Sequence, residues 1–154
     1  MLRKAEQKDI PRIAEIIIFT KRVTYRPIFN NDHVSFNVMQ VMSEAEEYAK
    51  PHGLDDLYVY DDGIVKAIVK YWLKDGEIEI SDFYVDWFFQ HQGLGTKILD
   101  EIFAQGYPVS LYVLDKNEKA IKFYEKYGFS YCNEKKEFEN SGFFMLKYAK
   151  NAIK

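Results

Sequence analysis

FFQHQGLGTKIL, residues 88–99, joins an apolar stretch of β-prone residues to a stretch whose apolar residues recur at helical spacing. Gly93 and Gly95 lie where the second stretch begins, and a polar turn that includes Gln90 leads into them. This arrangement predicts a strand, a polar turn and a helix that begins near Gly93. Two glycines at this point need a reason, because glycine weakens a helix.

Anion binding supplies that reason. The first N–H groups of a helix have no partner within the helix, and they lie at the positive end of the helix dipole. Phosphate groups bind there readily, and glycines remove side chains that would hold an anion away from the amides. The pattern therefore predicts a site for a diphosphate. Tight packing of the helix on the strand is the alternative explanation for a glycine pair considered alone.

Two other phosphate-binding patterns fit this stretch poorly. The dinucleotide-binding pattern G-x-G-x-x-G requires a third glycine where Ile98 stands, and it normally opens the first βαβ unit rather than one past mid-chain. The P-loop pattern ends in G-K-[ST], whereas residues 93–97 read GLGTK. A nucleotide-binding α/β protein is therefore a minor alternative.

The rest of the chain predicts a mixed α/β layer with one main sheet. The first predicted helix follows Asp9 as its N-cap, and the segment Thr24–His33, which contains Pro27, is predicted as a loop. The last predicted helix has Asn117 as N-cap and ends at Gly128. The full predicted order is strand 1–7, a helix from 10, a helix from 38 that closes near 51, strands 56–60, 64–73 and 77–85, helix 93–106, strand 108–114, helix 117–128, and strands 129–134 and 142–149.

The strand predicted at 77–85 contains an irregularity. Glu77, Glu79 and Ser81 alternate with isoleucines, but Asp82 is polar as well, so the alternation shifts by one residue. Such a shift indicates a β-bulge or a splayed strand end, both of which occur beside active sites. The alternative is that Asp82 lies at an exposed edge.

Composition restricts the class of protein. The 154 residues suit one domain spanning 1–154, and a net charge of −3 without a basic run argues against a nucleic-acid binder. Cys132 is the only cysteine, so neither an internal disulfide nor a cysteine-based zinc site can form. The N-terminus lacks the apolar region of a signal peptide, and the longest apolar run, Ile13–Phe19, is too short to span a membrane. We therefore expect a cytoplasmic protein.

Two blocks of the sequence resemble motifs of one known family. YVDWFFQHQGLGTKIL, residues 84–99, resembles motif A of the GNAT family of N-acetyltransferases, whose hallmark Q/R-x-x-G-x-G/A falls on residues 90–95. SLYVLDKNEKAIKFYEKYGF, residues 110–129, resembles the next block of that family, N-x-x-A-x-x-F-Y-x-x-x-G-F, at Asn117, Ala120, Phe123, Tyr124, Gly128 and Phe129. The topology of the whole chain suits the family. Trp87 and His91 depart from the residues that the family often has at these positions.

The resemblance implies a GNAT-like fold, which is a mixed, mostly antiparallel sheet of about six or seven strands, splayed in the middle and flanked by about four helices. It also implies transfer of an acetyl group from acetyl-CoA to a primary amine by direct attack in a ternary complex. The pyrophosphate would lie on the amides of Gln90, His91, Gln92, Gly93, Leu94, Gly95 and Thr96. The pantetheine arm would run along the preceding strand, with Phe83 and Val85 as backbone partners unless both residues pair within the sheet.

Catalytic roles follow from the same resemblance. Tyr124 matches the tyrosine that protonates the leaving thiolate, although a tyrosine at this spacing is otherwise typical of a core aromatic. Glu79 is the candidate base and Asp82 the second candidate, with a solvated strand carboxylate as the alternative for Glu79. Asn117 caps its helix, contacts the coenzyme, or does both.

In this family the acceptor cleft is usually shaped by two loops, here residues 25–33 and 133–141. Tyr25, Phe29 and Asp32 supply ring faces and a carboxylate for a cation, or they are ordinary loop residues. We expect acetyl-CoA and an amine acceptor as partners, with no nucleic acid and no membrane, and a homodimer is left open. A non-catalytic acyl-CoA-binding or regulatory module is the alternative function.

Overall fold

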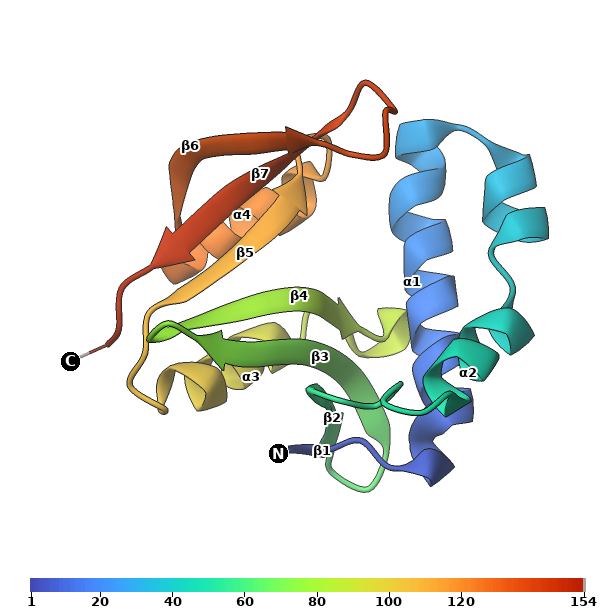
Figure 1. Cartoon of the computed structure of the whole chain (residues 1–154), viewed down its shortest axis with the longest axis horizontal. Helices are drawn as coiled ribbons and strands as arrows, with labels where there is room; N and C mark the ends of the chain where they lie inside the picture. The colour runs from blue at the N-terminus through green and yellow to red at the C-terminus, as the bar shows by residue number, and fades with distance from the viewer. Residues whose placement is uncertain (154) are drawn as a thin grey trace. The chain divides into compact units, whose positions relative to one another are not determined.

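The computed structural model describes residues 1–153, and its helices and strands follow the predicted order (Figure 1). The strands are β1 (Leu2–Lys4), β2 (Leu57–Asp61), β3 (Val65–Lys74), β4 (Glu77–Val85), β5 (Val109–Leu114), β6 (Ser130–Glu137) and β7 (Phe144–Lys150). The helices are α1 (Ile10–Phe29), α2 (Val41–Ala49), α3 (Leu94–Phe103) and α4 (Glu118–Tyr127), with short helical turns η1 (Gln7–Asp9), η2 (His33–Val38) and η3 (Trp87–Phe89). The strands hydrogen-bond in the order β1-β2-β3-β4-β5-β7-β6. Only the β4–β5 pair is parallel among the pairs with a defined register, so the sheet is mixed and mostly antiparallel, as predicted.

The backbone divides into two compact units. Unit 1 comprises Met1–Lys70 and Asp82–Ile98, and unit 2 comprises Tyr71–Ser81 and Leu99–Lys154. β3, β4 and α3 each contribute residues to both units. A single domain over 1–154 stays a prediction.

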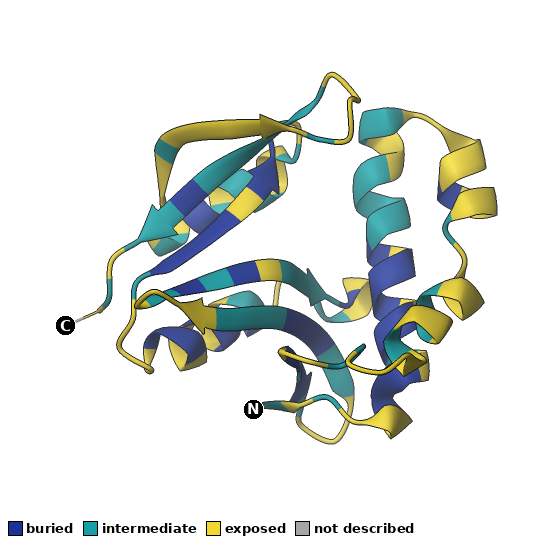
Figure 2. Ribbon diagram, viewed as in Figure 1, coloured by how far each residue is buried: buried dark blue, intermediate teal, exposed yellow. Residues whose placement is uncertain are grey.

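The core of unit 1 forms between α1 and the first strands. The isoleucines of α1 repeat at helical spacing and pack against apolar strand residues, in a cluster of Ile13, Ile16, Ile17, Leu57, Val59 and Ile68. Burial of each such side chain contributes roughly 1.5–3 kcal/mol. Figure 2 shows that the first half of α1 carries this buried face, whereas its second half is half-buried or exposed. The predicted apolar face of the first helix is therefore confirmed.

The end of α1 differs from the prediction. The loop predicted to begin at Thr24 is wrong, because α1 continues to Phe29 with Pro27 inside its last turn. Pro27 lacks one N–H donor, and only two helical residues follow it, so it interrupts little of the helix. The Tyr25 and Phe29 rings, one turn apart, pack with centroids 5.9 Å apart and favour continuation of the helix. α1 then ends at Asn30, a left-handed C-cap (φ 48°) whose N–H donates to the Arg26 carbonyl.

Asp9 precedes α1, as predicted, but its carboxylate does not cap that helix. Both carboxylate oxygens instead accept hydrogen bonds from the Arg3 guanidinium at 2.8 and 2.9 Å, and one also accepts from the Glu6 amide. A bidentate, charge-assisted pair with a guanidinium is stronger than a single hydrogen bond from a backbone amide. The Asp9 carboxylate therefore binds Arg3 instead of capping α1. The Arg3 hydrogen bonds lower the pKa of Asp9 from its ordinary value.

Unit 2 is held by α4 and the strands beside it. The Asn117 side chain accepts a hydrogen bond from the Ala120 amide at 3.3 Å, and Gly128 ends α4 at φ 114°, so both predicted caps are confirmed. Phe103 and Phe129 pack edge to face with centroids 5.9 Å apart in the core of this unit. α2 closes before Pro51 as predicted, but β6 runs to Glu137, past its predicted end at 134, because its last residues pair with β7.

Among residues 1–153, no helix combines the length and the apolar character that crossing a membrane requires.

The Arg3–Asp9 pair gives a stability prediction. Asp9→Asn should lower the free energy of unfolding at pH 7 by about 2 kcal/mol, because the variant loses a buried charge-assisted bond. A carboxyl whose folded pKa is depressed stabilises the fold above its unfolded pKa of about 3.9, and that stabilisation is lost as the pH falls through the folded pKa. The difference between wild type and variant should therefore shrink below about pH 4. Urea denaturation across this pH range measures it.

Asp55→Asn is the control for this prediction. Asp55 pairs with His52 at 2.9 Å, but 63% of its side chain is exposed, so its substitution should leave the urea midpoint nearly unchanged. Equal destabilisation by the two variants would contradict the role of Asp9.

Candidate functional site

The loop between β4 and α3 is anchored at its beginning by Asp86. This aspartate is 6% exposed; its Oδ1 accepts a hydrogen bond from the Phe88 amide at 2.8 Å, and its Oδ2 pairs with Arg12 Nη2 at 2.5 Å. The Asp86 amide also donates to the Lys66 carbonyl at 2.8 Å. The loop therefore leaves β4 along one defined path. Sequence analysis did not single out Asp86, although a carboxylate one residue before an apolar turn is typical of a turn cap.

The loop then presents a helix N-terminus. Gln90 Nε2 donates to the Val85 carbonyl at 3.0 Å, and the Lys97 amide donates to the Gly93 carbonyl at 3.1 Å, which closes a turn at the start of the helix. The amides that precede Lys97 have no acceptor within α3. His91 (φ 62°) and Gly93 (φ 77°) both adopt left-handed backbone, so the loop curls sharply before the helix begins at Leu94.

Gly93 leaves open space at this N-terminus. A Cβ built on Gly93 would meet no other atom within 4 Å, so close packing is not what requires glycine here. The left-handed φ favours glycine here, and the open space leaves the helix amides accessible. The positive dipole, the amides that lack an acceptor within α3 and the open approach fit a diphosphate, although the Gln90 amide already donates to the Trp87 carbonyl at 3.4 Å.

Phe83 and Val85, the predicted partners of a pantetheine arm, lie on the last part of β4 and are half-buried. The Val85 carbonyl already accepts from the Gln90 side chain, which leaves it one further lone pair. The ladder between β4 and β5 runs over Ile78–Ile80, and β4 continues beyond it to Val85. Burial alternates up to Ile80 and then ceases to alternate, but a bulge at Asp82 stays a prediction.

Glu79 is half-buried on β4 in unit 2, where it is paired with Ser110 in the β4–β5 register. Its Oε2 accepts a hydrogen bond from Trp72 Nε1 on β3 at 3.1 Å. This bond orients the carboxylate and leaves its other oxygen with acceptor capacity. Sequence analysis missed Trp72, although the tight turn at 74–76 brings the ends of β3 and β4 together.

Asp82, the second candidate base, lies near three tyrosines of unit 1. The hydroxyls of Tyr25 and Tyr84 share a hydrogen bond, and the Asp82 charge acts on Tyr25, Tyr48 and Tyr84. Burial raises the pKa of all three phenols, and the negative charge of Asp82 raises each further. Asp82 and Tyr25, predicted for different roles, therefore belong to one cluster. Tyr84 could have been found, because it lies two residues from Asp82 and shares its face of β4.

The other two predicted acceptor residues lie near the end of α1. Phe29 packs on Tyr25. Asp32 is exposed and accepts two hydrogen bonds from Arg26, at 2.7 and 3.2 Å, which lower the pKa of its carboxyl. A cationic ligand at Asp32 would therefore compete with Arg26.

Tyr124 and Asn117 both lie on α4 or at its start in unit 2. Tyr124 is 8% exposed and packs edge to face on Phe129, with centroids 5.5 Å apart. Its main-chain carbonyl accepts from the amides of Gly128 and Phe129. Asn117 uses its side-chain oxygen as the helix cap. Among residues 1–153, no three histidine, cysteine or carboxylate side chains gather to hold a metal ion.

Solved structures with the same fold are numerous. An N-acetyltransferase from Staphylococcus aureus matches with a TM-score of 0.74 and 16% identity, over 97% of this chain and 100% of that one. PaiA N-acetyltransferase from Thermoplasma acidophilum, in complex with coenzyme A, matches with a TM-score of 0.67 and 18% identity over 96% of each chain. An acetyltransferase of the GNAT family from Bacillus cereus matches with a TM-score of 0.64 and 14% identity, over 100% and 98%. At these identities the likeness establishes the fold.

The family itself follows from a sequence comparison. A family model described as the acetyltransferase (GNAT) domain matches residues 53–131, just over half of the chain. The match contains both predicted motif blocks, the loop before α3 and the Asn117–Phe129 block. The chain therefore belongs to the GNAT family of acetyl-CoA-dependent acyltransferases.

Proposed function

We propose that this protein transfers the acetyl group of acetyl-CoA to a primary amine of a small molecule or a protein, by direct attack in a ternary complex. The observation that carries the proposal is the open, left-handed Gly93 at the N-terminus of α3. Glycine adopts this left-handed backbone without strain, and its missing side chain lets an anion approach the helix amides. Gly93 also falls within the stretch that matches the family.

The residues for holding the coenzyme are those of the loop before α3. The amides from Gln90 to Thr96, with His91, Gln92, Gly93, Leu94 and Gly95 between them, would bind the pyrophosphate. Phe83 and Val85 would offer backbone groups to the pantetheine arm. Asn117 caps α4 and is also a candidate contact for the coenzyme.

Acetyl-CoA, when bound, supplies a thioester carbonyl that an amine can attack. An amine attacks only when it is neutral, so a base must first take its proton. Glu79 is our first candidate for that base, because Trp72 fixes one carboxylate oxygen and leaves the other able to accept. Tyr124 would donate its phenolic proton to the sulfur of the departing thiolate.

Asp82 suits a different task. A carboxylate next to three tyrosine rings resembles the surroundings that attract a cationic amine, through charge and ring faces together. We therefore assign Asp82 and Tyr25 to acceptor binding first, with Asp82 as the alternative base. Phe29 extends the ring surface beside Tyr25, and Asp32 is the weaker candidate because Arg26 already holds it.

Gly93→Glu should weaken acetyl-CoA binding at least tenfold, a cost of about 1.4 kcal/mol, because its carboxylate would occupy the anion site. Isothermal titration with acetyl-CoA measures the affinity. Gly76→Glu is a matched control: Gly76 has the same φ of 77° and equally open surroundings, but it lies in the β3–β4 turn. Both variants should lose similar stability, and only the Gly93 variant should lose affinity. Equal affinities would remove the loop from the coenzyme site.

Tyr124→Phe should lower kcat by at least tenfold and change the KM for acetyl-CoA little, because it removes an acid and no binding surface. The assay detects free thiol with the best acceptor from a screen of primary amines. Tyr127→Phe is the control. It also removes a tyrosine hydroxyl from α4, one that donates to Asp100, and the variant should keep the wild-type kcat. An unchanged kcat in the Tyr124 variant would favour packing, and coenzyme binding without any turnover in wild type would favour the non-catalytic module.

Glu79→Gln and Asp82→Asn separate the two carboxylates. If Glu79 is the base, Glu79→Gln should lower kcat by about a hundredfold and flatten the rise of rate with pH. Asp82→Asn should instead raise the KM for the amine and retain the pH profile. The reverse pattern would exchange the two assignments.

A further inference from the structure

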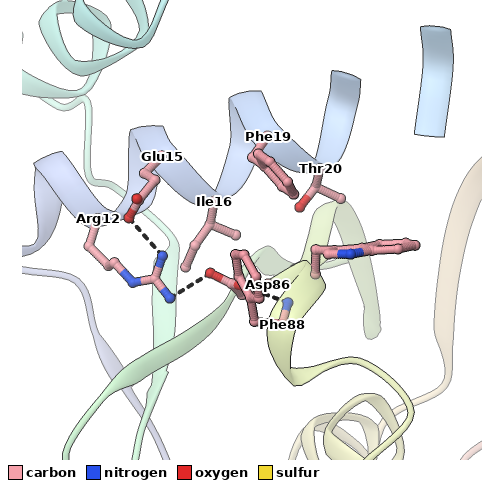
Figure 3. Close-up of a pocket in the computed structure, with 8 residues that line it drawn as sticks. Arg12, Glu15, Ile16, Phe19, Thr20, Asp86 and Phe88 are labelled. Atoms are coloured by element: carbon pink, nitrogen blue, oxygen red, sulfur yellow. Dashed lines mark hydrogen bonds and ion pairs between the residues drawn. The ribbon is translucent and has the colours of Figure 1, made fainter. Parts of the chain in front are cut away.

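A pocket of about 220 Å³ lies in unit 1 between α1 and the turn η3, and neither the coenzyme nor the acceptor residues account for it. Ile16, Phe19 and Thr20 line it from α1, and Asp86, Trp87 and Phe88 line it from the turn, with Arg12 and Glu15 at one end (Figure 3). A cavity of about 150 Å³ can hold a benzene ring. The volume therefore suits a ring system of one or two fused rings.

The pocket lining includes a buried hydroxyl, that of Thr20, without a hydrogen-bond partner among the described residues. The residue is only 7% exposed. Figure 3 shows the Thr20 hydroxyl directed from α1 toward the turn that carries Asp86 and Phe88. A buried hydroxyl without a partner costs free energy, so a ligand that bonds to it gains an advantage over one that does not.

The aromatic residues make a wall that remains in contact with solvent. The Phe19 and Phe88 rings stack with centroids 6.0 Å apart and planes 21° apart. Phe19 is 40% exposed, Trp87 44% and Phe88 75%. Rings stacked at this distance leave no room for a third ring between them, so a ligand would lie against the pair and cover it.

The charges of the pocket select against anions. Each nitrogen of the Arg12 guanidinium has a partner: Nε donates to the Val65 carbonyl, Nη1 to Glu15 at 2.8 Å, and Nη2 pairs with Asp86. Two carboxylates therefore face one guanidinium, which leaves one net negative charge. No cationic side chain of the lining is left to receive an anionic group.

We propose that this pocket binds a flat heteroaromatic ring, neutral or cationic, that covers the Phe19–Phe88 pair and bonds to the Thr20 hydroxyl. The site is separate from the anion-binding loop before α3 and does not depend on acetyl transfer. Ring faces supply most of the affinity, and the single hydroxyl distinguishes a heteroatom-bearing ring from a hydrocarbon of the same shape.

Quinoline and naphthalene test the proposal, because they share one shape and only quinoline carries a hydrogen-bond acceptor. Amide chemical shifts of the isotope-labelled full chain, titrated with each probe in the absence of acetyl-CoA, report the site and the affinity. Quinoline should bind more tightly than naphthalene and shift the amides of Thr20 and Phe88. Naphthalene-2-carboxylate, an anion, should bind at least threefold more weakly than naphthalene. The absence of saturable shifts with quinoline would overturn the proposal.

Thr20→Val removes the hydroxyl and keeps the branched shape, and it should fold because the lost group has no partner. It should weaken quinoline binding by about threefold to tenfold and leave naphthalene binding unchanged. Thr24→Val, one helical turn further along α1 and outside the pocket lining, should change neither affinity. Phe88→Ala should weaken both probes by a similar factor. Equal loss of both probes in Thr20→Val would refute the hydroxyl's role.

Acetyl-CoA titrated into the quinoline complex separates this site from the coenzyme site. Retention of bound quinoline at saturating acetyl-CoA supports a separate pocket, and its displacement would overturn that claim. Both titrations measure binding alone, so the result stands or fails independently of whether the protein acetylates an amine.

Discussion

The buried carboxylate of Asp86 fixes how β4 gives way to the loop that opens α3. One oxygen holds the Arg12 guanidinium of α1, the other caps the Phe88 amide, and the backbone of the same residue is tied to Lys66. A buried charge is costly unless it is paired and hydrogen-bonded, and here both conditions are met. A helix N-terminus binds an anion well only if its amides are held in place beforehand. Asp86 therefore acts on the candidate coenzyme site without belonging to it.

The parts of the fold that could be predicted are those encoded by a few contiguous residues. Asn117 and Gly128 mark the start and the end of α4, and Gly93 marks where α3 begins. These signals depend on local backbone geometry, so the sequence alone carries them. The end of α1 could not be read in the same way. Pro27 is a local signal against helix, and the Tyr25–Phe29 contact and the Asn30 cap outweigh it.

The parts of the site that could not be predicted depend on residues distant in sequence. Asp82 and Tyr25 were both candidates, but nothing in their spacing indicates that they share one cluster with Tyr48 and Tyr84. Asp9 shows a different limit: Arg3 is only six residues away on β1, but nothing in the local cap signal indicates that the Asp9 carboxylate pairs with it. The contact between Trp72 and Glu79 lies between these extremes. A short hairpin turn brings the two residues together, so the strand register alone predicts that they are neighbours.

Within unit 1, the turn from Asp86 to Phe88 has two faces with different chemistry. Its chain continues into the candidate coenzyme loop, whose amides and glycines would favour negative groups. Its side chains line the pocket. There the Arg12 guanidinium pairs with two carboxylates, and the Thr20 hydroxyl has no hydrogen-bond partner among the described residues. The loop would therefore favour an anionic ligand, whereas the pocket would favour a neutral or cationic one. Asp86 anchors the first and lines the second, so its ion pair with Arg12 holds one end of the loop and one end of the pocket in place.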